Sequence, residues 1–397
     1  MPRFPLNIWV LALCFSLAMS GVALLVLVGA LIGSSLAPSE KMASLPMALF
    51  VIGNASFSIP AAMAGRRWGR KRAAYCGFGL SLLSAIAASV AISSTSFAFF
   101  CIASSLCGCG TAFYHQFRFA ALESLKNADD AGPALSLILL CSIVGSVLGP
   151  ELGSLGRELL PGEPYSASFL LYALMLLLAM LIFSLFRNPE PNEPEQQQPA
   201  RSLKQIAAQP LFIVAAGSAA LAYAVMSFLM TSTPLSMHVV DGHSLEHAKN
   251  VIQAHMVAMF LPSLFSGFLL KKLGPAKLML AGTALYGGVC IVGLSGQHVV
   301  HYWWALVLLG VGWNFLFLSG TALLPQSYHH SERFKAQALN DFSVFGLQAI
   351  ASLSSAWVLF AIGWQAQLWL CLIPIAASLA MSLWLWRQPR AVSVNKR

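Results

Sequence analysis

Two short basic turns, GRRWGRKR at residues 65–72 and LKKLGPAK at residues 270–277, decide how this sequence is organised. Each turn follows one long apolar stretch and precedes another, and each carries a glycine near its centre, Gly69 and Gly274. Similar turns at corresponding places in the two parts of a membrane chain indicate an internal repeat. We therefore expect two halves of similar architecture.

The apolar stretches around these turns are long enough to cross a membrane, which takes about 20 apolar residues. Of the 397 residues, 58% are hydrophobic and only 9% are charged, whereas soluble domains carry about 25% charged residues. Twelve such stretches occur, at about residues 8–33, 44–64, 73–94, 97–122, 133–153, 166–186, 210–235, 250–270, 277–296, 301–324, 338–361 and 366–386. The sequence predicts an all-α membrane protein with twelve transmembrane helices in two pseudo-symmetric six-helix bundles.

One hydrophilic stretch, at residues 187–209, interrupts the apolar pattern. Its Pro, Glu and Gln content is typical of a solvated linker. Since it lies between the sixth and seventh spans, we expect an N-terminal bundle at 1–186 and a C-terminal bundle at 210–397. No loop is long enough to hold a soluble catalytic domain.

The basic residues predict the orientation of the chain. With twelve spans both termini lie on one side, and that side holds all 23 Lys and Arg residues except Lys41, Arg118, Arg157 and Lys249. The positive-inside rule therefore places both termini and the linker in the cytoplasm, in a multi-pass inner (plasma) membrane protein. The same distribution accounts for the net charge of +9. We therefore expect the lipid bilayer as a partner, and no nucleic acid.

The first basic turn resembles a motif of the major facilitator superfamily, G-x-x-x-D-R-x-G-R-R/K between helices 2 and 3. The matching residues are Arg67, Gly69, Arg70 and Lys71. Ala62 replaces the first glycine, and Arg66 replaces the aspartate. In the family this acid helps to latch the two halves on the cytoplasmic side, so the resemblance implies that any such latch here uses acids elsewhere.

A second resemblance lies in the fifth span, where GSVLGPELG at 145–153 is similar to the G-x-x-x-G-P-x-x-G signature of antiporters in the superfamily. The signature residues are Gly145, Gly149, Pro150 and Gly153. Small residues let helices approach closely and proline permits a bend, so an ordinary tight helix contact is the alternative. The R-x-x-Q-G motif of proton-coupled drug exporters is missing, since Ser104 stands at the arginine position.

Charged residues within the spans are candidates for gating, because a charge at mid-helix costs roughly 2.5–3.5 kcal/mol. Arg118 in the fourth span and Asp341, beside Asn340, in the eleventh lie at similar depth. In the superfamily these helices help to close the cytoplasmic gate, so we expect an ion pair that breaks when the gate opens. Further candidates for gating or proton coupling are Glu151, His115 and Glu123.

Two of these candidates have simpler interpretations. Glu123 lies near a helix end, where a long side chain can reach water. A single membrane histidine such as His115 often serves as a hydrogen bond between helices. Asp341 and Glu151 are proton-coupling candidates if burial shifts their titration into the working range.

The substrate cavity of this fold is lined mainly by helices 1, 4, 7 and 10 near mid-membrane. Polar and aromatic residues at mid-span there are Ser16, Ser20, Thr111, Tyr114, His115, Tyr223, Ser227, Trp313, Asn314 and Phe317. Aromatic rings with a few polar groups suit an amphipathic organic solute. Ordinary helix packing is the alternative for each residue.

Catalytic motifs are absent from the sequence, including the phosphate-binding loop, H-E-x-x-H and G-x-S-x-G. We therefore expect no enzyme, no cofactor and no metal site. The preferred function is secondary active transport of a small organic solute by alternating access in a monomer, as proton-coupled efflux. Proton-coupled uptake of a nutrient, vitamin or siderophore is the first alternative, and a non-transporting membrane sensor or scaffold is the second.

Overall fold

The structure is a computed structural model that describes residues 4–125, 131–160, 163–188, 201–329 and 332–388. Every regular element within these ranges is helical. The N-terminal bundle contains α1 (Leu6–Leu36), η1 (Glu40–Met42), α2 (Leu45–Trp68), α3 (Arg70–Ser93), α4 (Phe97–Tyr114), α5 (Phe117–Glu123), α6 (Ala131–Leu159) and α7 (Ser166–Phe183).

The C-terminal bundle follows a short helix, α8 (Leu203–Ala207). It contains α9 (Pro210–Pro234), η3 (Leu235–Val240), α10 (Leu245–Phe260), α11 (Ser263–Leu294), α12 (Val299–Leu323), η4 (Leu324–Ser327) and α13 (Arg333–Arg387). Non-helical glycines, Gly274 and Gly363, divide α11 and α13 into two helices each. We count α11 and α13 as two segments each, divided at these glycines. We count α4 with α5 as one segment, and α10 with the part of α11 before Gly274 as one segment. Each bundle then has six segments, as predicted.

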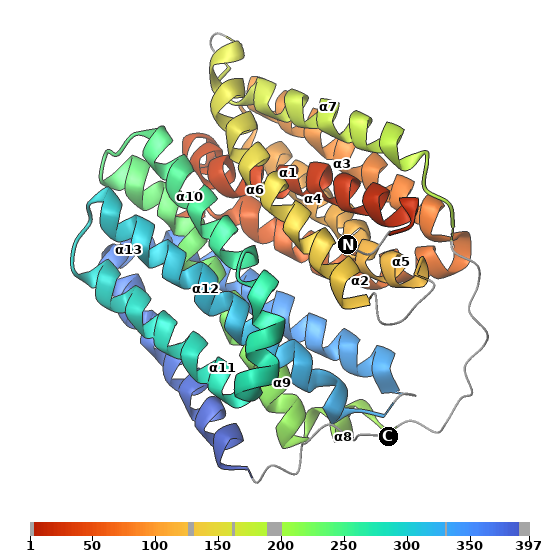
Figure 1. Cartoon of the computed structure of the whole chain (residues 1–397). Coiled ribbons are helices and arrows are strands. Elements are labelled where there is room, and N and C mark those ends of the chain that lie inside the picture. The colour runs from red at the N-terminus through yellow and green to blue at the C-terminus, as the bar shows by residue number, and fades with distance from the viewer. Residues whose placement is uncertain (1–3, 126–130, 161–162, 189–200, 330–331, 389–397) are drawn as a thin grey trace.

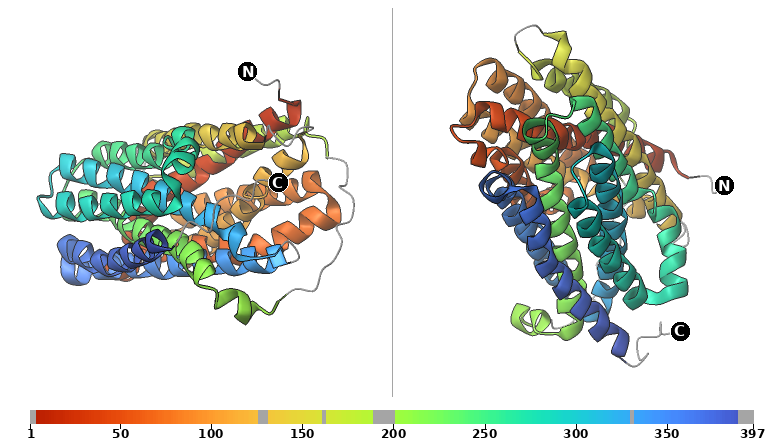
Figure 2. Two further views of the ribbon diagram at one scale, coloured as in Figure 1. Left: turned by 60° about the horizontal axis from the view of Figure 1, so that its bottom comes forward. Right: turned by 90° about the vertical axis from the view of Figure 1, so that its left-hand side faces the viewer.

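In the described part of the chain, nine helical stretches are long and apolar enough to cross a membrane, and one of them contains both parts of α13. The two bundles lie side by side, the N-terminal one red to yellow and the C-terminal one green to blue (Figures 1 and 2). We call the end that carries Gly69, α8 and η4 the linker end. The opposite end, which carries η1 and Gly363, is the far end.

The internal repeat predicted from the two basic turns is present in the backbone. Gly69 has φ 83° and ψ 156°, and Gly274 has φ 77° and ψ 164°. This region of backbone conformation is open essentially only to glycine. The same glycine turn therefore joins the second and third segments of both bundles.

The glycines of the antiporter-like signature pack directly on α1. A Cβ atom added to Gly145 would lie 2.4 Å from the Ser16 carbonyl oxygen, and one added to Gly149 would lie 2.2 Å from the Ser20 carbonyl oxygen. At Gly153 the nearest atom, a side-chain atom of α1, would be 3.1 Å away. The row of glycines therefore sets a close approach between α1 and α6 within one bundle.

Two predicted spans are interrupted. The fourth breaks at His115 and Gln116, between α4 and α5, and the eighth breaks at Leu261 and Pro262, between α10 and α11. Proline has no backbone N–H to continue a helix, which explains the second break. The first break carries neither proline nor glycine and was not predicted.

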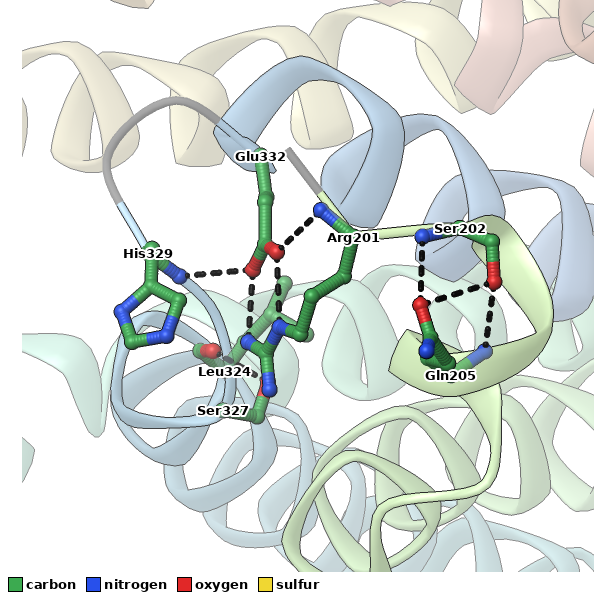
Figure 3. A network of polar contacts seen from close by, with 7 residues as sticks. All are labelled: Arg201, Ser202, Gln205, Leu324, Ser327, His329 and Glu332. Carbon is green, nitrogen blue, oxygen red and sulfur yellow. Dashed lines mark hydrogen bonds and ion pairs between the residues drawn. The ribbon is translucent and has the colours of Figure 1, made fainter. Parts of the chain in front are cut away.

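A buried ion pair fixes the C-terminal part of the predicted linker to the turn between α12 and α13 (Figure 3). The Glu332 carboxylate, fully buried, accepts hydrogen bonds from Arg201 N, Nε and Nη2 at 2.8, 2.7 and 2.6 Å. It also accepts one from His329 N at 2.9 Å. The Arg201 guanidinium holds the pKa of Glu332 well below its usual range. We call Arg201 and Glu332 the linker clasp.

Candidate functional site

Five aromatic side chains form a cluster in the C-terminal bundle: Tyr223 on α9, Phe260 on α10, Trp313 and Phe317 on α12, and Phe345 on α13. The ring centroid of Tyr223 lies 5.1 Å from the ring centroid of Trp313 and 5.5 Å from that of Phe317. Phe345 is 6.0 Å from Tyr223, and Phe260 is 6.2 Å from Trp313. Trp313 and Phe317 stack at 4.9 Å with an interplanar angle of 12°. Three of the predicted substrate residues are thus brought together.

The cluster reaches the N-terminal bundle through His115. Its ring stacks against Phe345 at a centroid distance of 6.4 Å and an interplanar angle of 29°. His115 lies directly after the last residue of α4, at the break before α5. The unpredicted break therefore carries a side chain that contacts the opposite bundle.

Arg118 and Asp341, the predicted gate residues, lie on facing bundles within electrostatic reach of each other. Arg118 also acts electrostatically on Tyr223 of the aromatic cluster. Asn340 Nδ2 donates a hydrogen bond to Asp341 Oδ1 at 3.1 Å. Arg118 is exposed and Asp341 is partly buried. Charge of both signs therefore borders the cluster on its linker-end side.

Ser227 and Gln348 add polar groups near the same cluster. Gln348 Nε2 donates to Ser227 Oγ at 2.9 Å, which links α9 to α13. Sequence reasoning identified Ser227 but missed Phe260, Phe345 and Gln348. The spacing of Asp341, Phe345 and Gln348 at i, i+4 and i+7 places them on one helix face, a signal that was available in the sequence.

Four other predicted substrate residues form hydrogen bonds to neighbouring helical turns or helices. Asn314 Nδ2 donates to the Met259 carbonyl at 2.7 Å and to Ser263 Oγ at 2.8 Å. The hydroxyls of Ser20, Thr111 and Tyr114 donate to the carbonyls of Leu17, Cys107 and Gly77 at 2.6, 2.8 and 3.1 Å. These four side chains make these hydrogen bonds within their own bundles.

Glu151 takes part in a contact between the bundles at the far end. Its carboxylate accepts from Lys249 Nζ at 3.2 Å and from Gln253 Nε2 at 3.1 Å. Gln253 Nε2 also donates to the Val147 carbonyl at 3.1 Å, and Lys249 pairs with Glu246 at 2.8 Å. We call Glu151, Lys249 and Gln253 the far-end clamp. It joins α6 of one bundle to α10 of the other.

A second contact between the bundles lies at the same end. Ser44, at the start of α2 and fully buried, donates to the Leu353 carbonyl at 3.0 Å. Its hydroxyl also accepts from Ala356 N at 3.4 Å. The far-end clamp and the Ser44 contact together hold the two bundles closed at the far end.

Comparison with known proteins agrees with this architecture. The model of the Major Facilitator Superfamily matches residues 8–253 and 221–397. The chain belongs to the major facilitator superfamily. As a member, it is a multi-pass membrane protein of a family of solute transporters.

Three relatives align with most of this superfamily member. The riboflavin transporter RfnT of Brucella anthropi is 33% identical over 391 residues, which cover 98% of each chain. The uncharacterized MFS-type transporters YddS and YdeG of Bacillus subtilis are each 32% identical over 81% of this chain, covering 77% and 78% of their own lengths.

The superfamily turn between α2 and α3 makes its contacts within the N-terminal bundle. Arg70 Nε donates to Glu123 Oε2 at 2.9 Å. Lys71 Nζ donates to the Ser184 carbonyl at 2.6 Å, and its backbone N–H donates to Asn188 Oδ1 at 2.8 Å. The acid opposite this turn is therefore Glu123, which ties α3 to α5.

Two further arginines, Arg66 and Arg67, precede Gly69 in this turn, and the structure describes the side chain of Arg67 only. Arg67 is exposed at the linker end. The side chain of Arg66, which replaces the family aspartate, lies outside the described part of the structure. The expectation that any latch between the two halves uses acids other than one at this position therefore stays a prediction.

Proposed function

We propose that this protein carries riboflavin, or a similar flavin, into the cell by alternating access. The observation that carries the proposal is the aromatic cluster of Tyr223, Trp313, Phe317 and Phe345, which the charged residues Arg118 and Asp341 border on the linker-end side. The riboflavin transporter RfnT, related over nearly the full length of both chains, supports the same solute class. This choice replaces proton-coupled efflux as the preferred direction.

The chemistry of a flavin suits this cluster. A flavin is a flat three-ring system with an apolar face, carbonyl and N–H groups along one edge, and a chain of hydroxyls in riboflavin. The aromatic side chains can stack on its face, each pair adding about 0.5–1.5 kcal/mol beyond area burial. The Ser227 hydroxyl and the Gln348 amide supply hydrogen-bonding groups for the polar edge or the hydroxyl chain.

In the proposed cycle, the observed closed far end corresponds to a state that exchanges solute at the linker end. The distribution of basic residues supports a cytoplasmic linker end in the inner membrane. When the far end opens, Arg118 and Asp341 would approach each other and close the linker end. The contact of His115 with Phe345 lies at the edge of the cluster that faces the N-terminal bundle, so the solute would pass it.

Proton-driven export is the second candidate. The observation that favours it is the antiporter-like signature, Gly145 to Gly153 in α6. These glycines pack on α1 inside one bundle. Because these glycines serve helix packing, they are weaker evidence about which solute is carried than the aromatic cluster is.

Flux of riboflavin into proteoliposomes, followed by its fluorescence, tests the proposal. We expect saturable uptake by the wild type and an apparent affinity about 3- to 10-fold weaker in Tyr223→Ala and Phe317→Ala, from the loss of one stacking contact each. Phe265→Ala is the matched control, because that ring is 63% exposed on α11, outside the cluster. Absence of protein-dependent flavin flux would refute the proposal.

The direction is tested in the same vesicles. If flavin transport is coupled to protons, an imposed pH gradient should accelerate flavin flux in one direction and not in the other. Reversing the gradient should reverse the accelerated direction. Acceleration when protons and flavin move together indicates uptake. Acceleration when they move in opposite senses indicates the export candidate.

A further inference from the structure

A groove of about 390 Å³ lies at the far end, between the two bundles. Its walls come from both bundles: Lys41, Met42 and Leu45 from η1 and α2, and Leu353, Ser354 and Trp357 from α13. The volume is in the range of about 300–1,000 Å³ that is typical of small-molecule sites. Trp357 is 55% exposed and Leu353 is 47% exposed, although both belong to a membrane-spanning helix.

The groove combines an apolar wall with one positive charge. Among the described residues that line it, Lys41 is the only charged side chain. It lies in η1, beyond the end of the membrane-spanning α1, where the headgroups of the far leaflet would be. Trp357 lies less than two turns before the break at Gly363, and tryptophan is enriched near the membrane–water interface.

We propose that this groove binds an anionic phospholipid of the far leaflet. The acyl chains occupy the apolar wall formed by Leu45, Leu353 and Trp357, and the headgroup phosphate pairs with the Lys41 ammonium. Basic pockets between transmembrane helices on the cytoplasmic side bind anionic lipid headgroups, and Lys41 offers a single positive charge of the same kind at the far leaflet. The proposal does not depend on which solute the protein carries.

The lipid would also favour the closed far end. The Ser44 hydroxyl, which donates to the Leu353 carbonyl and accepts from Ala356 N, joins the start of α2 to α13, and these two elements form walls of the groove. When the far end opens, these elements separate and the groove loses one wall. A ligand that binds only one arrangement stabilises that arrangement, so the lipid and the closure of the far end are linked.

Thermal unfolding of the purified full-length protein in detergent, with added lipid, tests the site. Phosphatidylglycerol should raise the unfolding midpoint by about 3 °C or more above phosphatidylcholine with the same acyl chains. Inorganic phosphate at the same concentration should give no such rise, because it lacks the acyl chains. Equal rises with the two lipids, or a rise with phosphate alone, would overturn the proposal.

Three variants locate the effect. Lys41→Gln should abolish the difference between the two lipids, and Ser354→Leu, which fills the groove, should abolish it too. Lys277→Gln, at an exposed lysine of the linker end, should retain it. A full lipid difference in Lys41→Gln or Ser354→Leu would place the site elsewhere, as would its loss in Lys277→Gln.

The link to closure is measured with spin labels on the far end of each bundle. In a Cys76→Ser, Cys141→Ser background, labels at Ser94→Cys and Ser295→Cys report the separation of the two bundles at that end. Phosphatidylglycerol should increase the population at short distances, and Lys41→Gln should prevent the increase. An unchanged or longer distance would refute the link.

Discussion

Adding one methyl group to the contact between α1 and α6 provides a graded test of the packing. In Gly149→Ala the new Cβ atom would lie 2.2 Å from the Ser20 carbonyl oxygen and 2.6 Å from both Ala23 Cβ and Leu24 N. Most of these atoms belong to the backbone, so a side-chain rotation cannot relieve the overlap. The two helices must therefore move apart.

The cost follows from two opposing effects. Overpacking of a well-packed contact costs about 1–3 kcal/mol, whereas replacing glycine by alanine inside a helix gains up to about 1 kcal/mol. Gly149→Ala and Gly145→Ala should therefore lose about 1–2 kcal/mol of stability. Gly153→Ala should be nearly neutral, because the closest atom, at 3.1 Å, is the end of a Leu24 side chain that can move.

Thermal unfolding midpoints of the four variants in one detergent check this order. Gly79→Ala is the control, because no atom lies within 4 Å of its added Cβ, and its midpoint should equal or exceed that of the wild type. Gly149→Ala and Gly145→Ala should unfold a few degrees lower. Gly149→Ala as stable as Gly79→Ala would show that α1 and α6 are not packed as described.

Three other perturbations test the remaining charged contacts. Glu332→Gln should lower the unfolding midpoint near neutral pH, with exposed Glu158→Gln as the unchanged control. Because the folded-state pKa of Glu332 is lowered, its stabilisation is complete above about pH 5 and declines as the pH falls further, so melting curves of wild type and Glu332→Gln should converge in acid. Arg118→Asp and Asp341→Arg should each reduce flux in proteoliposomes by about tenfold, equivalent to about 1.4 kcal/mol, and the double exchange should restore it; no restoration would argue against the pair. Glu151→Gln should weaken the far-end clamp by about 1 kcal/mol and increase the open population about fivefold, measured as longer distances between the spin labels on Ser94→Cys and Ser295→Cys; an unchanged distribution would remove the clamp from the gate.

The fold followed from features that depend on local sequence. Long apolar runs, basic turns and the matched glycines Gly69 and Gly274 each carry their structural meaning without tertiary information. The same holds for the spacing of Gly145, Gly149 and Gly153, for which a close helix contact was the alternative to the antiporter-like signature. The partner of that contact, α1, was not predictable, because a row of small residues does not identify the helix it meets.

The site was predicted in part, for a physical reason. A membrane helix that is apolar all round has no polar stripe to fix its rotation about its own axis. Mid-span position therefore selected Tyr223, Trp313 and Phe317, which lie together in the aromatic cluster, but it also selected Thr111 and Tyr114, which form hydrogen bonds within their own bundle. Their side of the helix depends on packing with distant segments.

Tertiary pairing also explains the charged residues that sequence reasoning undervalued. The polar sequence around Glu332 gives no local sign that this side chain is buried, because its partner Arg201 lies more than a hundred residues earlier. Lys249 was counted only for orientation, although it is buried at the far-end clamp.

The far-end clamp has a consequence for the medium in which the protein works. Lys249 is nearly buried, but the side chains of its acidic partners Glu151 and Glu246 are 51% and 58% exposed. Ion pairs with exposed members weaken as dissolved salt accumulates around them. We therefore expect dilute surroundings to hold this end shut more firmly than saline ones, so that ionic strength on that side alone should shift the balance between a closed and an open far end.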